Sequence, residues 1–507
     1  MIALDRRPGG RDRPPDGTVG LAPAGSPGGR APALALLAAL GLGCASEPPR
    51  SEPAPAVAQE PEASEPEADP EGGEPQEPST SGSIPQTAAP AAEPKASGSS
   101  SPLHGSLTSV WRGRLGKSEH DNDLYGLLAL DYGDSTRDKW TGHFIGRLAA
   151  DLDGDGTGPF FQLDDTLGDD VDLRLYDAYA EGHGVGPLES LRLGRQRISD
   201  TPAFVWFDGA RAETKPRGKS ALQFGAWGGI PVHLYESGDS KDLVAGLYLQ
   251  GRPWTGGRLR FDWMHLEDDD DGADHEDDLL GLSAWQSLGE RLRLETSYTR
   301  LEGEDRDVSA RATWSDAKDD LQLQASYYRL LETQEALALE IDPFFTTLFE
   351  LFPYEQARLL ASKRLGEKVG VQAGLDVRRV DDEDDEGLFN RDFERGFATL
   401  TLDEVLPSDV TLALTGEVWD GDGSDIETWG ADLSRRFRDD LTASLGSYYA
   451  LFKSDLFTAS EREDVRTWYT RLRWKNTKST TWDLRYEAED TDFGWFHLLR
   501  LGLTWRF

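Results

Sequence analysis

Arg500-Leu501-Gly502-Leu503-Thr504-Trp505-Arg506-Phe507 ends the chain as a strand with one apolar and one polar face. Side chains alternate between the faces of a strand, so the leucines, Trp505 and Phe507 share one face. Chain ends usually fray, which would leave these aromatic rings exposed to water. In a closed membrane barrel the last strand instead pairs with the first, between lipid and a wet lumen. The alternative is an ordinary antiparallel strand that ends in phenylalanine.

The same residues resemble the C-terminal insertion signal of Gram-negative outer-membrane β-barrels. The resemblance rests on a polar residue, a glycine two positions later and two aromatic residues, which here are Arg500, Gly502, Trp505 and Phe507. It implies a porin-like protein of the bacterial outer membrane that the β-barrel assembly machinery inserts.

The composition of the 507 residues fits such a barrel and excludes several other classes of protein. A single cysteine excludes a disulfide framework and a cysteine-based metal site. The mean hydropathy of -0.55 argues against helical spans, whereas barrel strands need only half an apolar pattern each. The net charge of -39 argues against a nucleic-acid partner.

The chain before residue 103 is expected to divide into two segments. Residues 1–44 carry basic residues, a short apolar core and then small residues, which predicts a secretion signal. Cys44 at its end resembles a lipoprotein cleavage site, although Gly41 stands where leucine is usual; lipidation and simple cleavage both stay open. Residues 45–102 are rich in Pro, Glu, Ala and Ser, which predicts a disordered acidic linker that a periplasmic partner could bind.

Residues 103–507 alternate apolar and polar side chains in runs of roughly ten, which predicts an all-β fold: one transmembrane antiparallel barrel of about 22 strands, with a range of 18 to 24. Every second connection is short, as at 289–290, 366–367, 438–439 and 476–477. The intervening connections are longer and acidic: 117–123, 153–170, 267–278, 381–392, 420–425 and 453–464. Outer-membrane barrels sort their loops in this way, so the acidic loops are expected outside, near lipopolysaccharide.

Arginines recur on the polar face of these runs. A charge on the lipid face costs about 2–4 kcal/mol at mid-membrane, so arginines that alternate with apolar neighbours should point into the lumen. Two interpretations stay open: a network with carboxylates that stiffens the wall, or a path for anions. The arginines are Arg147, Arg211, Arg260, Arg293, Arg311, Arg358, Arg471, Arg473 and Arg485.

Asp151, Asp153 and Asp155 precede a glycine at the sixth position, as in a calcium loop. Gln162 stands where a bidentate glutamate is expected, so the pattern predicts at most a weak outer-loop Ca²⁺ site; the alternative is a solvated acidic loop. No other cofactor is expected. The apolar stretch 335–354 is also unusual for a connection, and predicts an inward constriction, a partner contact or an extra lipid-facing strand.

Gly194-Arg195-Gln196 and Phe207-Asp208-Gly209-Ala210-Arg211 resemble a pattern of the alginate-export family of outer-membrane barrels. The resemblance covers some 20 residues and implies a monomeric barrel whose arginine-rich lumen passes an anionic polysaccharide. The acidic linker departs from that family.

The sequence therefore predicts an outer-membrane channel or export pore for anionic solutes or an anionic polysaccharide. One alternative is a barrel sheath around a periplasmic electron-transfer partner. The other is an outer-membrane hydrolase, although no histidine has metal-ligand spacing and no serine lies in a nucleophile elbow, so no enzyme is expected.

Overall fold

A computed structural model of the chain describes most of the region after residue 101. The described residues are 102–116, 120–152, 171–232, 242–270, 273–335, 350–382, 391–404, 409–421, 424–455, 460–491 and 494–507. Among them, no helix is long and apolar enough to span a membrane.

The described residues form β-strands joined by turns. The strands are β1 (Leu103–Leu115), β2 (His120–Tyr132), β3 (Trp140–Asp151), β4 (Val171–His183), β5 (Leu188–Ile198), β6 (Val205–Thr214), β7 (Gln223–Pro231), β8 (Leu243–Gly251), β9 (Gly257–Asp270), β10 (Ala273–Leu288), β11 (Leu292–Leu301), β12 (Glu304–Asp316), β13 (Leu321–Leu330), β14 (Gln334–Glu335), β15 (Glu350–Leu351), β16 (Tyr354–Leu365), β17 (Val369–Val380), β18 (Phe393–Leu402), β19 (Val410–Gly421), β20 (Ser424–Arg438), β21 (Leu441–Asp455), β22 (Ser460–Trp474), β23 (Thr480–Thr491) and β24 (Gly494–Arg506).

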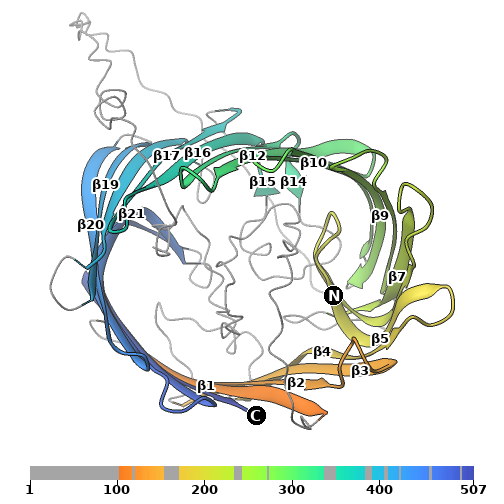
Figure 1. Cartoon of the computed structure of the whole chain (residues 1–507), viewed down its shortest axis with the longest axis horizontal. Helices are drawn as coiled ribbons and strands as arrows, with labels where there is room; N and C mark the ends of the chain where they lie inside the picture. Colours follow the sequence, from red (N-terminus) through yellow and green to blue (C-terminus); the bar gives the residue numbers. More distant parts are fainter. Residues whose placement is uncertain are drawn as a thin grey trace, which may run out of the picture. The chain divides into compact units, whose positions relative to one another are not determined.

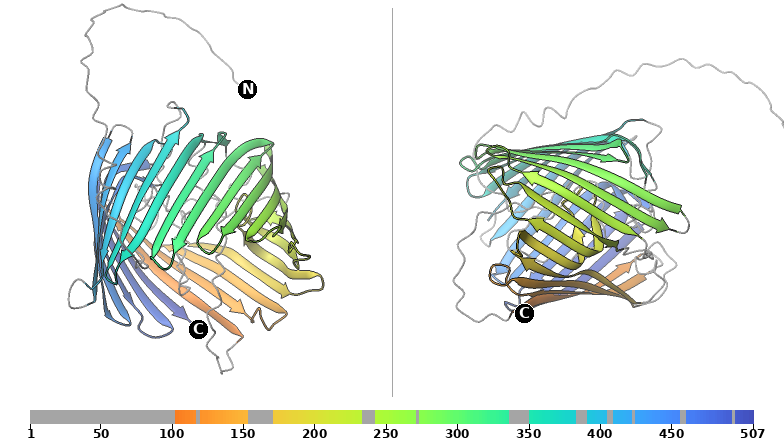
Figure 2. Two further views of the ribbon diagram at one scale, coloured as in Figure 1. Left: turned by 45° about the horizontal axis from the view of Figure 1, so that its top comes forward. Right: turned by 90° about the vertical axis from the view of Figure 1, so that its right-hand side faces the viewer.

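Twenty-two of these strands form one antiparallel sheet that closes on itself (Figures 1 and 2). Each strand pairs with its neighbour along the chain, and β24 pairs with β1 through partners such as Trp505 and Leu107. Two backbone hydrogen bonds between Gly105 and Phe507, of 2.9 and 3.0 Å, continue this seam. Closure leaves no free edge, which is the condition for strands to cross a membrane. The predicted barrel and its strand number are confirmed.

Large apolar side chains are exposed on one face of the barrel strands and charged side chains lie on the other. On β3, for example, Trp140 and Leu148 are exposed, and Arg147 takes the opposite face. The register carries this division from strand to strand, because directly paired residues share a face. The apolar face is the outer surface of the barrel. Exposed residues on it include Leu107, Trp140, Leu148, Leu173, Leu193, Phe224, Leu249, Phe261, Leu282, Leu323, Leu359, Leu414, Leu433, Leu445, Trp468, Leu501 and Trp505.

The connections sort by strand parity as the sequence predicts. The short turns at 289–290, 366–367, 438–439 and 476–477 all lie at the barrel end that holds Phe507. The strand ends that flank the acidic segments lie at the opposite end, here called the far end. The expectation of long loops there is wrong for four of them, 117–123, 267–278, 420–425 and 453–464. There the paired strands β1–β2, β9–β10, β19–β20 and β21–β22 include much of each segment, because backbone ladders keep forming beyond the apolar band.

Deleting Phe507 tests the seam between β1 and β24. The deletion removes both hydrogen bonds to Gly105, each worth about 1 kcal/mol, and is expected to lower the amount of protein inserted in the outer membrane. Quantification of the folded, heat-modifiable species in membrane fractions measures this. Phe507→Leu keeps the backbone bonds and serves as the control. Unchanged insertion after the deletion would contradict a role for the terminal residue.

Candidate functional site

The inner face of the barrel carries all nine arginines that alternate with apolar residues in the sequence. On every strand concerned they lie opposite exposed apolar side chains: Arg260 lies between Leu259 and Phe261 on β9, and Arg358 precedes Leu359 on β16. The others on this face are Arg147 of β3, Arg211 of β6, Arg293 of β11, Arg311 of β12, Arg471 and Arg473 of β22, and Arg485 of β23.

Further arginines that are not among the nine predicted ones share this face. The same alternation indicates them in the sequence, since Arg112 and Arg114 follow Trp111 and Gly113 on β1. The others are Arg174 and Arg192, which pair in register with Arg147 and Glu181, together with Arg258, Arg364, Arg378 and Arg395.

Four of the inward arginines form a row across four neighbouring strands. Arg471 of β22 is the register partner of Arg485 of β23, which is the partner of Arg500 of β24, which is the partner of Arg112 of β1. We call these four residues the arginine row. Directly opposed side chains lie about 4.5–5.5 Å apart at Cβ, and like charges in such positions destabilise the sheet. The row therefore concentrates positive charge on one part of the inner wall.

Carboxylates neutralise part of this charge. Within the row, Arg112 bonds to Asp123 at 2.5 Å and Arg485 to Glu487 at 2.6 Å. Outside the row, Arg473 contacts Asp483 at 2.9 Å. The wall thus combines an ion-pair network with the directly opposed guanidinium groups of the row.

Two other inward arginines have no carboxylate within ion-pair distance among the described residues. They are Arg293 of β11 and Arg311 of β12. Arg311 faces Glu295 in register but makes no salt bridge with it. Arg293 is exposed and Arg311 is half-buried. Both are therefore inward cations that a solute can reach.

The connection 199–204, between β5 and β6, folds across the inner wall, and we call it the inner loop. Its Asp200 accepts a hydrogen bond of 2.7 Å from Arg260 of β9, and lies 3.3 Å from Arg211 of β6. Strands β7 and β8 separate these two arginines, and Pro202 reaches Gly281 on β10. At about 4.8 Å per strand, the part of the wall from β6 to β9 that the loop crosses is roughly 15 Å wide. No pattern in the sequence predicted that this connection folds inward.

An apolar cluster underlies the inner loop and explains why it stays folded inward. Nine buried residues of the loop and of the inner faces of β5–β10 make this cluster, which removes them from water in a part of the barrel where polar side chains are otherwise expected. They are Ile198, Ala203, Val205, Phe207, Trp227, Val244, Met264, Leu266 and Leu279.

The charge of Asp200 stabilises the same arrangement. Burial alone would raise the pKa of this carboxyl group, but Arg211 and Arg260 hold the pKa below its ordinary value. A depressed pKa contributes stability above the ordinary carboxyl range, and that stability is lost as the pH falls through the lowered value. The loop is therefore anchored at neutral pH by two arginines of the predicted lumen set.

The motif that resembles the alginate-export pattern has a structural role here. Arg195 donates two hydrogen bonds to Asp208 on the outer face, of 2.9 and 2.7 Å, and the buried Gln196 donates to the carbonyls of Gly194 and Gly209. Gly194 has a φ of +122°, and Gly209 lies against the backbone of β7. These contacts fix the register of β5 and β6 directly before the inner loop.

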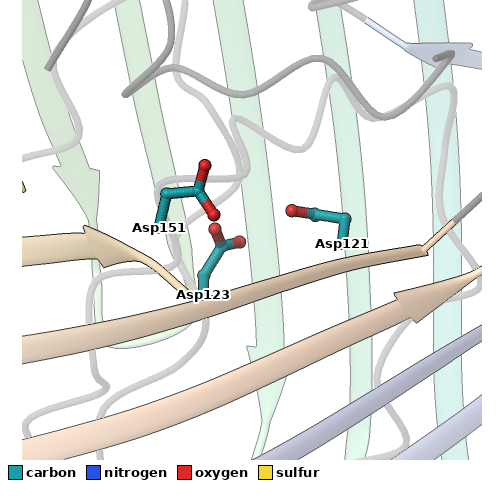
Figure 3. A group of neighbouring side chains, drawn as sticks. All are labelled: Asp121, Asp123 and Asp151. Atoms are coloured by element: carbon teal, nitrogen blue, oxygen red, sulfur yellow. The ribbon is translucent and has the colours of Figure 1, made fainter. Parts of the chain in front are cut away.

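Asp151, a residue of the predicted calcium loop, lies beside Asp121 and Asp123 of β2 (Figure 3). Asp153 and Asp155 lie outside the described residues, as do the proposed signal, Cys44, the linker and most of the apolar stretch 335–354. The described ends of that stretch, β14 and β15, pair only with each other and add no strand to the barrel. The four residues of the insertion signal lie on β24 or just after it, with Arg500 and Gly502 facing inward.

No family model matches the chain, and no curated protein matches it. Solved structures of similar architecture include the P pilus usher (PapC) translocation pore, with 9% identity over 80% of this chain and 99% of that chain and a TM-score of 0.48. The siderophore receptor PirA from Pseudomonas aeruginosa has 9% identity over 80% and 81%, with a TM-score of 0.46. OccK3 (OpdO) from the same organism has 15% identity over 80% and 95%, with a TM-score of 0.37. At such identities the likeness concerns the fold alone.

The closed sheet and its apolar outer face are the form in which strands cross the bacterial outer membrane. The chain is an outer-membrane β-barrel protein, as the sequence predicts.

Proposed function

We propose that the barrel is a passive channel that prefers anionic solutes, and that the arginine row is the surface these solutes follow. The observation that carries the proposal is the register of Arg471, Arg485, Arg500 and Arg112 on four neighbouring strands. Like charges at directly opposed positions repel, and an anion that passes between guanidinium groups relieves this repulsion. Guanidinium groups also bind carboxylate and sulfate or phosphate groups through paired donors.

The inner loop supports a solute path rather than a sheath around a protein. Asp200 and Pro202 bring the loop across the inner faces of β6–β10, so it takes up space that a protein partner inside the barrel would need. A loop on the inner wall narrows the passage to small solutes or to an extended chain. An anionic polysaccharide is an extended chain and carries repeated carboxylates that the guanidinium groups can bind. The more specific form of the proposal is therefore that the barrel passes an anionic polysaccharide.

Single-channel recordings in planar bilayers test the proposal. In a salt gradient the wild-type reversal potential should indicate anion preference, and Arg471→Gln with Arg500→Gln should shift it toward cation preference. These two residues belong to the row and lie on β22 and β24, on either side of Arg485. A several-fold loss of anion-to-cation permeability ratio is expected, because charge rings on the wall set the selectivity of wide pores.

Arg438→Gln is the matched control, since Arg438 ends β20 beside a turn, where it contacts Asp440. Its reversal potential should equal that of the wild type. A barrel that does not conduct, or a double variant with unchanged selectivity, would contradict the proposal. A conducting barrel whose anion preference is lost equally in the control would assign selectivity to overall charge and not to the row.

A further inference from the structure

Three aspartates converge on the inner face at the far end of the barrel. Asp121 and Asp123 come from the beginning of β2 and Asp151 from the end of β3, and one carboxylate oxygen of each lies within 4.8 Å of the others. Figure 3 shows the carboxylates of Asp123 and Asp151 directed toward each other, with that of Asp121 directed toward both. The register makes this meeting possible, because Asp123 and Asp151 are direct partners.

In each of the two buried aspartates, Asp121 and Asp123, only one carboxylate oxygen accepts hydrogen bonds. Oδ2 of Asp123 accepts from Arg112 at 2.8 Å and from the Tyr125 hydroxyl at 2.9 Å, and Oδ2 of Asp121 accepts from Arg114 at 2.6 Å. The Oδ1 atoms of both residues are buried and have no hydrogen-bond partner. Asp123 is fully buried and Asp121 is 4% exposed. A buried acceptor without a hydrogen-bond partner costs about 1–3 kcal/mol of stability. A ligand that binds the Oδ1 atoms of Asp121 and Asp123 would remove this cost.

A divalent cation fits the spacing of these carboxylate oxygens. Arg112 contacts Asp123 and Arg114 contacts Asp121, and Asp151 adds a third carboxylate to the cluster. Ca²⁺ binds oxygen ligands at 2.3–2.6 Å, so two of its ligands lie no more than about 5 Å apart, which the aspartate oxygens satisfy. Mg²⁺ usually keeps several waters and takes only one or two carboxylates, so three carboxylates favour Ca²⁺.

We propose that Asp121, Asp123 and Asp151 hold one Ca²⁺ ion on the inner wall, where it ties β2 to β3. Because two guanidinium groups lie beside the site, binding is expected to be weak, with a Kd on the order of 10⁻⁴–10⁻³ M, as in extracellular calcium modules. The proposal does not depend on conduction through the barrel.

Terbium luminescence tests the site on the full chain refolded in detergent. Tb³⁺ replaces Ca²⁺, and the Tyr125 ring, whose hydroxyl contacts Asp123, should sensitise its emission. Ca²⁺ should displace Tb³⁺ at lower concentration than Mg²⁺. Asp123→Asn and Asp151→Asn should each reduce the sensitised signal at least five-fold. Asp151 is only half-buried, so Asp151→Asn keeps the test usable if Asp123→Asn does not fold.

Asp131→Asn is the matched control, because Asp131 is also an inward aspartate of β2 but pairs with His143 at 2.6 Å, away from the cluster. It should keep the full signal. Terbium emission that persists in Asp123→Asn and Asp151→Asn would overturn the proposal, because the ion would then bind the acidic loops. No displacement by roughly 10 mM Ca²⁺, above the range of weak extracellular sites, would overturn it as well.

Discussion

Gly209→Ala is expected to prevent most of the chain from reaching the folded, heat-modifiable barrel. A Cβ atom at position 209 would lie 2.1 Å from the carbonyl oxygen of Gly228 on β7, and 2.8 Å from the Cα of Gly229. These are backbone atoms of a paired strand, so they cannot move aside without breaking the β6–β7 ladder. The cost should be about 3 kcal/mol or more, at the upper end of overpacking effects. Urea unfolding in detergent, followed by tryptophan fluorescence, measures it.

Gly416→Ala is the matched control for this substitution. Gly416 lies within β19 of the same sheet, and a Cβ atom there would meet nothing within 4 Å. Its variant should unfold at the wild-type urea concentration. If Gly209→Ala folded as well as Gly416→Ala, the close approach of β6 and β7 described here would be wrong.

Glu417→Gln is expected to destabilise the barrel by about 3 kcal/mol, at the lower end of the cost of breaking a buried ion pair. Glu417 lies 3.3 Å from Arg395 and accepts a hydrogen bond of 3.0 Å from the Trp419 indole. Both side chains of the ion pair are almost fully buried, and Arg395 lies over the rings of Phe397 and Trp419. The amide keeps the size of the side chain but leaves the guanidinium charge without this partner. The neighbouring Asp376 keeps the cost at the lower end, since it faces Arg395 in register.

The exposed pair Lys368–Glu404, also within salt-bridge distance at 2.7 Å, provides the control. Glu404→Gln should cost no more than about 1 kcal/mol, because exposed ion pairs contribute little. Replacing both buried partners, as in Arg395→Met with Glu417→Leu, should restore part of the stability lost in Glu417→Gln. Equal unfolding midpoints for Glu417→Gln and Glu404→Gln would show that burial does not matter at this pair.

Local alternation was enough to predict the barrel. The apolar face of residues 500–507, repeated about every ten residues, predicted both the number of strands and the end of the barrel at which each connection lies. Local composition did not predict where strand pairing continues into a connection. The acidic segment 267–278 reads as a loop by composition, yet most of it belongs to β9 and β10, because backbone pairing is indifferent to the charge of exposed side chains.

Sequence alone also determined the face that each inward arginine takes, because residue parity on a strand decides it. It could not determine which of these arginines meet. Arg112 and Arg500 are far apart in the chain and become partners only when the barrel closes. The contact of Asp200 with Arg260 depends on a loop that crosses the intervening strands. The approach of Asp121 to Asp151 depends on the register between β2 and β3. The face that a side chain takes depends on residue positions within one strand, so the sequence determines it. Barrel closure and strand register depend on contacts between strands that are distant in the sequence, so only the folded barrel determines them.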